Sequence, residues 1–78
     1  MKDDKFIKIN KDSVLNQDEV VRKKVNGVLE YYFVSDYDNQ SKKYILKSFA
    51  GNAENVGFKI VTTTQDLIDN FEKRYENN

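Results

Sequence analysis

The sequence predicts an α+β fold: an antiparallel sheet of 3–4 strands with a C-terminal helix packed on one face, in the order β-α-β-β-β-α. Apolar and polar residues alternate through much of segment 28–49, a pattern typical of strands joined by a hairpin. Apolar residues then recur at helical spacing in segment 64–78. The chain has 78 residues, and we expect a single small domain over 1–78.

Segment 16–26 follows a short predicted strand at 5–10, and we interpret it as a helix. Asn16 and Glu19 have the spacing of a capping box, in which each residue's side chain bonds the other's backbone N–H. Acidic residues come first in the segment and basic residues last, as the helix dipole favours. Asn26-Gly27 then supplies a left-handed stop.

A β-hairpin is the alternative for the same segment. Asn26-Gly27 is also a strong signal for a type I′ turn between two strands. Such a hairpin sets Lys23 opposite Glu30, and it puts Arg22 beside Tyr31. We favour the helix because the hairpin places basic residues on the face that we expect to be buried.

The remaining elements follow from alternation and from glycine positions. We expect a strand at 28–35, a turn at 36–41, a strand at 42–49, a loop at 50–57, a strand at 58–62 and a helix at 64–78. Thr63 or Thr64 is the expected cap of this helix. Its apolar stripe consists of Leu67, Ile68, Phe71 and Tyr75.

Alternation along the strands separates two faces of the sheet. The expected core face carries Ile7, Ile9, Leu29, Tyr31, Phe33, Tyr44, Leu46, Phe58 and Ile60. The opposite phase of the strands would bury four charged residues, so we reject it. On the second face, aromatic residues alternate with lysines.

This second face is the predicted binding surface. Aromatic side chains supply large apolar contacts, and lysines supply charge around them. The candidate partner-binding residues are Tyr32, Lys43, Ile45, Lys47, Phe49 and Lys59.

Catalytic, metal and cofactor sites are not expected. The chain has no His and no Cys, which removes the commonest general base and the strongest nucleophile. Asp36, Asp38 and Gln40 match the start of a calcium loop, but Ser41 and Lys47 stand where Gly and Glu are required. We therefore expect a protein that is not an enzyme and has no cofactor.

Composition bounds the partners and the source. Thirteen basic and thirteen acidic residues cancel, which is unlike a strongly basic nucleic-acid binder. Lysine greatly exceeds arginine and proline is absent, as in proteins encoded by AT-rich genomes. Neither a signal peptide nor a membrane span is recognisable, so we expect a cytoplasmic protein of a low-GC bacterium or of a phage-infected host cell.

The element order α-β-β-β-α resembles that of double-stranded-RNA-binding domains. The basic cluster that opens the last helix of that family falls here on Thr63 to Asp66, "TTQD", and no family is assigned.

We expect a small regulatory protein that docks on a protein partner, such as an inhibitor or accessory protein of a phage or mobile element. Single-stranded nucleic acid is the second expectation, and a homo-oligomer that uses the face as its own interface is the third. No membrane partner is expected.

Overall fold

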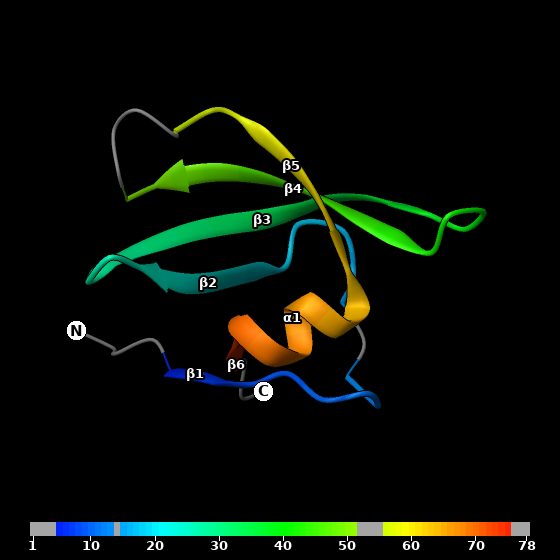
Figure 1. Ribbon diagram of the computed structural model, residues 1–78, viewed down its shortest axis with the longest axis horizontal. Coiled ribbons are helices and arrows are strands. Elements are labelled where there is room, and N and C mark those ends of the chain that lie inside the picture. The colour runs from blue at the N-terminus through cyan, green and yellow to red at the C-terminus, as the bar shows by residue number, and fades with distance from the viewer. Residues whose placement is uncertain (1–4, 14, 52–55, 76–78) are drawn as a thin grey trace.

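One antiparallel sheet of six strands and one short helix make up the described chain (Figure 1). The structure is a computed structural model, and it describes residues 5–13, 15–51 and 56–75. Its elements are β1 (Lys5–Lys8), β2 (Val20–Val25), β3 (Val28–Asp38), β4 (Lys43–Ala50), β5 (Lys59–Thr63), α1 (Thr64–Asn70) and β6 (Glu72–Tyr75). The predicted fold class is therefore wrong, because the sheet has six strands and the one helix of the described residues is short and is followed by a strand.

The strand order is β1-β6-β2-β3-β4-β5, so β2 to β5 form a meander of neighbouring strands. After β5, at one edge, the chain turns into α1, which leads across one face of the sheet (Figure 1). It then returns as β6, which lies between β1 and β2. Parts of the predicted loop 50–57 and of the predicted helix 64–78 lie outside the described residues.

The predicted helix at 16–26 is wrong, and the hairpin alternative gives the observed structure. Asn26 and Gly27 have φ angles of 51° and 83°, both positive, as a type I′ turn requires. Lys23 lies opposite Glu30 in the register of β2 and β3. Three valines in this segment fit a strand better than a helix, and pairing with β3 outweighs the local helix signals.

The capping-box residues still contact each other, within an isolated turn. The backbone N–H of Asn16 donates to a carboxylate oxygen of Glu19 at 3.1 Å, and the N–H of Glu19 donates to the Asn16 carbonyl at 3.1 Å. Asp18 between them has a φ of 72°, in the left-handed region that a right-handed helix does not use. Only the Glu19 half of the capping box is thus formed, because the Glu19 N–H bonds the Asn16 backbone and not its side chain, and no helix follows.

The C-terminal helix begins as predicted but is much shorter. The Thr63 hydroxyl accepts a hydrogen bond from the Asp66 N–H at 3.1 Å, which is the expected cap. The chain becomes extended at Phe71, with φ of −117° and ψ of 161°. Residues 72–75 then pair with both β1 and β2, so sheet pairing replaces the predicted helix over these four residues.

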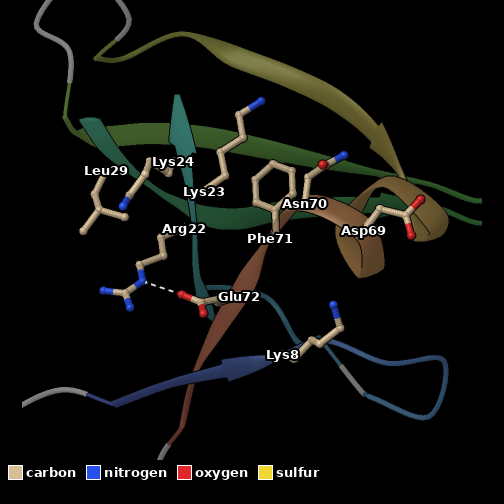
Figure 2. A pocket seen from close by; sticks show the side chains of 9 residues that line it. All are labelled: Lys8, Arg22, Lys23, Lys24, Leu29, Asp69, Asn70, Phe71 and Glu72. Carbon is tan, nitrogen blue, oxygen red and sulfur yellow. Dashed lines mark hydrogen bonds and ion pairs between the residues drawn. The ribbon is translucent and has the colours of Figure 1, made fainter. Parts of the chain in front are cut away.

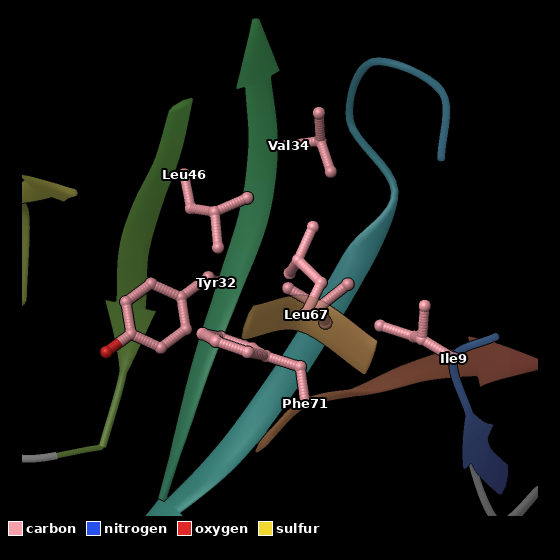
Figure 3. Packing of buried hydrophobic residues seen from close by; sticks show 7 residues of the cluster. Ile9, Tyr32, Val34, Leu46, Leu67 and Phe71 are labelled. Carbon is pink, nitrogen blue, oxygen red and sulfur yellow. The ribbon is translucent and has the colours of Figure 1, made fainter. Parts of the chain in front are cut away.

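Seven side chains form the buried core between α1 and one face of the sheet (Figure 3). They are Ile9, Val21, Tyr32, Val34, Leu46, Leu67 and Phe71. Leu46 and Ile9 were predicted for the core, and Tyr44 and Ile60 pack against it. The predicted core residues Leu29, Tyr31 and Phe33 instead point to the opposite face, while Ile7 and Phe58 are exposed.

A β-bulge at Ser35 explains the reversed phase of β3. Near the turn Tyr37 pairs with Tyr44, but beyond the bulge Val34 pairs with Leu46. One extra residue in one strand of a pair exchanges the faces of every later residue relative to its partner strand. Without the bulge, Leu46 would share a face with the odd-numbered residues of β3, as predicted.

In the observed orientation of β3, one charged residue is buried. We had rejected this orientation because we expected it to bury four charged residues. Glu30 is 3% exposed, and its carboxylate accepts a hydrogen bond from the Tyr32 hydroxyl at 2.8 Å. Lys43, Lys47 and Lys59 stay on the opposite face of the sheet, because only β3 changes phase at the bulge.

Phe71→Ala should lower the free energy of unfolding by about 3–5 kcal/mol, because a large buried ring is lost and a cavity remains. The ring is 2% exposed and packs edge-on against Tyr32, with 5.7 Å between ring centroids. Phe58→Ala is the matched control: the ring of Phe58 is 63% exposed, and we expect a loss below about 1 kcal/mol. Urea denaturation of both variants tests this, and equal losses would show that the core is wrongly placed.

Candidate interaction surface

The sheet face turned away from α1, here called the outer face, carries most of the large side chains that the core does not use. Register and alternation place on it Val20, Arg22 and Lys24 of β2, Leu29, Tyr31 and Phe33 of β3, Lys43, Ile45, Lys47 and Phe49 of β4, and Lys59 and Val61 of β5. The one described helix packs on the other face, against the core.

Four rings form a continuous line on this face, which we call the aromatic row: Phe6, Tyr31, Phe49 and Phe33. The centroid distances are 5.8 Å from Phe6 to Tyr31, 6.3 Å from Tyr31 to Phe49, and 6.1 Å from Phe49 to Phe33. Each distance is within the range of favourable aromatic pairs. The row therefore joins β1 to the neighbouring strands β3 and β4, although β6 and β2 lie between β1 and β3 in the sheet order.

Phe49 is the most exposed member of the row, because it is the extra residue of a second β-bulge. Tyr31 pairs with Ala50 and Tyr32 pairs with Ser48, so Phe49 has no partner of its own on β3. A bulge bends the strand and redirects the side chain it carries. The Phe49 side chain is 45% exposed and lies between the rings of Tyr31 and Phe33.

Arg22 ends the row on the β1 side. Its guanidinium carbon lies 4.0 Å from the centroid of the Phe6 ring, a close cation–π contact. Its Nε donates to a carboxylate oxygen of Glu72 at 2.9 Å. Burial is the largest single effect on the pKa of Arg22 and lowers it, but hydrogen bonds and charge interactions with Glu72 and Tyr31 together outweigh burial and raise the pKa. Arg22 thus remains charged and is held in place beside the rings.

Lysines border the row on the other side, and two of them lie directly opposite each other. Lys47 of β4 pairs with Lys59 of β5 in the register, and Ile45 pairs with Val61 one step along. Like charges directly opposite each other across two strands are destabilising. The outer face therefore combines an apolar line with a basic pair that the sheet itself does not favour.

Five of the six predicted binding residues share the outer face: Lys43, Ile45, Lys47, Phe49 and Lys59. Tyr32 does not, because it is 3% exposed and belongs to the core. The sequence reasoning missed Tyr31, Phe33, Phe6 and Arg22. The hairpin alternative could have identified two of these residues, because it placed Arg22 beside Tyr31.

A cleft of about 490 Å³ opens beside β2, between β6 and α1 (Figure 2). Four cationic side chains line it: Lys8, Arg22, Lys23 and Lys24. Figure 2 shows that the three lysine ammonium groups point in different directions and that the Arg22 guanidinium is paired with the Glu72 carboxylate. The cations do not converge on one point, so the cleft does not form an anion site.

A second groove, of about 440 Å³, lies on the α1 side of the sheet between Lys23, Phe58 and Ile60. Its inner wall includes Glu30, Tyr32 and Ser48. The Ser48 hydroxyl is buried and has no hydrogen-bond partner among the described residues. Burial, followed by the hydrogen bond to Glu30, raises the pKa of Tyr32 to about 12. This wall belongs to the core, and its polar groups lie beneath the surface.

Within residues 5–13, 15–51 and 56–75, no group of three or more acidic residues, His or Cys is placed to hold a metal ion. In the same part of the chain, no helix is long and apolar enough to cross a membrane. Comparisons of the chain with known protein families, curated proteins and solved structures give no match.

Tyr32→Phe should change how stability responds to alkaline pH. The folded protein holds the Tyr32 proton more tightly than the unfolded chain, so its stabilising effect is complete below pH 10.0 and is lost as pH rises through about 12. The variant should lack this part of the alkaline loss. Tyr75→Phe, at an exposed position, is the control and should keep it. Denaturation midpoints measured at a series of alkaline pH values test the prediction, and identical profiles for both variants would contradict it.

Proposed function

We propose that this protein is a small non-enzymatic binding protein that docks on a protein partner through its outer face. The observation that carries the proposal is the aromatic row next to the opposed Lys47–Lys59 pair, on the face that α1 does not cover. Protein interfaces combine an aromatic, apolar centre with a polar rim, and Arg is enriched in them. The outer face has this composition.

The opposed lysines indicate the chemistry of the partner. Their repulsion costs stability in the free protein, and local rules of this kind are most often broken where function requires it. A carboxylate placed between Lys47 and Lys59 would interact favourably with both ammonium groups. We therefore propose a partner with an apolar patch bordered by acidic side chains.

The ring geometry favours a protein partner over single-stranded nucleic acid. Bases stack on flat, accessible ring faces. Here the rings pack against one another at interplanar angles of 66°, 47° and 36°, so much of each ring face is used within the row. Phe49 is suited to fill a pocket on the partner as an anchor residue. The zero net charge of the chain also supports this choice.

The small size of the chain and its amino-acid composition, which is typical of proteins encoded by AT-rich genomes, support a regulator or inhibitor from a phage or mobile element. Proteins of this type act by occupying a surface of a host protein and need no catalytic groups.

Capture experiments with matched phenylalanine variants test the docking surface. Wild-type protein, Phe49→Ala and Phe58→Ala serve as baits in a lysate of a low-GC bacterium, with and without nuclease, and retained proteins are identified by mass spectrometry. We expect the wild type and Phe58→Ala to retain the same protein, and Phe49→Ala to bind it with affinity lower by about 2 kcal/mol or more.

Two outcomes would overturn the proposal. Loss of all binding after nuclease treatment would indicate a nucleic-acid partner. Undiminished retention by Phe49→Ala would show that the outer face is not the docking surface.

Lys59→Gln should stabilise the protein and weaken binding at the same time. Removing one of two opposed charges should raise the free energy of unfolding by about 0.2–1 kcal/mol. The same change should lower the on-rate for the captured partner and reduce the salt dependence of that rate. Urea denaturation and surface plasmon resonance measure the two effects. Stabilisation with unchanged binding would mean that the lysine pair does not contact the partner.

A further inference from the structure

The two edges of the sheet differ in how they are protected against pairing with another strand. The outermost strands are β1 and β5. β1 has four residues, "KFIK", with a lysine at each end, and lysines on an edge discourage further strand addition. β5 has one lysine at its start, followed by four uncharged β-branched residues, "IVTT". Unprotected edges of this composition pair readily.

The hydrogen bonds between β4 and β5 show which backbone groups face the open edge. The Ser48 N–H donates to the Phe58 carbonyl at 3.0 Å. In an antiparallel ladder such bonded positions recur at every second residue, so Ile60 and Thr62 direct their backbone groups toward β4. The backbone groups of Lys59 and Val61 and the N–H of Thr63 therefore point away from the sheet. The Thr63 carbonyl is not available to the edge, because Thr63 is the N-cap of α1 and its carbonyl accepts the first bond of the helix.

We propose that the β5 edge pairs with the β5 edge of a second copy of this chain, in an antiparallel arrangement with its two-fold axis at Val61. In this register Val61 lies opposite the second Val61, and Lys59 lies opposite Thr63 on both sides of the axis. Val61 thus meets its own equivalent and can form two reciprocal hydrogen bonds with it, and on each side of the axis the Thr63 N–H can donate to the Lys59 carbonyl of the other copy.

Charge and exposure fit this register. Lys59 meets an uncharged threonine, so no like charges are directly opposed across the axis. The Val61 side chain is 64% exposed in the single chain and would be partly covered by its equivalent. The axis runs through the sheet, so the outer faces of both copies lie on the same side of the joined sheet. Two docking surfaces would then be presented together.

The pairing involves one strand of five residues from each copy, which is less contact than most stable interfaces have. We therefore expect a weak dimer that dissociates on dilution.

A charge-exchange experiment tests both the dimer and its axis. Val61→Lys and Val61→Glu each place two like charges across the axis, and each should lower the association constant at least about tenfold relative to wild type. An equimolar mixture of the two variants should form a heterodimer, because the charges then attract. Val28→Lys and Val28→Glu, at the exposed first residue of β3, are the controls and should dimerise like wild type.

Sedimentation velocity over about a hundredfold range of concentration measures the association. Restored association in the mixture supports the two-fold axis at Val61. A wild-type protein that is monomeric throughout, or a dimer unaffected by either Val61 variant, would overturn the proposal. The wild-type protein could also stay monomeric and show protection of the β5 amides from hydrogen exchange only when an extended peptide is added. This result would overturn the dimer and indicate that the β5 edge binds a different partner. Binding of the captured partner to wild-type protein diluted into its monomeric range would separate this result from the docking proposal.

Discussion

The register between β3 and β4 is the constraint on which the rest of the structure depends. A single extra residue, Ser35, moves Tyr32 and Val34 to the side of α1 and leaves Tyr31 and Phe33 on the other side. Because side chains alternate with a period of two, no intermediate arrangement exists. The core, the aromatic row and the burial of Glu30 all follow from this one shift.

Much of the strand pattern could be predicted from the sequence, whereas the register could not. The expected strands 28–35, 42–49 and 58–62 lie close to β3, β4 and β5, and Thr63 caps the helix as expected. Alternation within each strand also placed five candidate residues of β4 and β5 on one face. A bulge changes how one strand faces another, and no residue type near Ser35 marks it. The same holds for segment 16–26, where local capping signals competed with pairing to a strand, and for β6, whose strand conformation depends on pairing with β1 and β2.

The observed phase places polar groups in the core, and the fold accommodates them by close packing and hydrogen bonding. Glu30 receives the Tyr32 hydroxyl, which is how a buried carboxylate avoids an isolated charge. Gly51 passes directly over it: a Cβ at Gly51 would lie 2.8 Å from the Glu30 Cα, and its φ of 126° favours glycine. The residue after β4 is therefore restricted to glycine by the close approach of the β3 backbone at Leu29 and Glu30.

A seven-residue helix can cover only one face of a six-stranded sheet, so an apolar second face follows partly from the architecture. Packing alone would explain Tyr31 and Phe33, which shield each other through Phe49. It does not explain why the neighbouring register positions carry Lys47 opposite Lys59, where any uncharged β-branched residue would be more stable. Nor does packing alone explain why a residue as large as Phe49 stands at the bulge in β4, where its ring is exposed. Lys47, Lys59 and Phe49 are thus less favourable for the stability of the free protein than other residues would be. Residues of this kind are expected where a surface is maintained for binding.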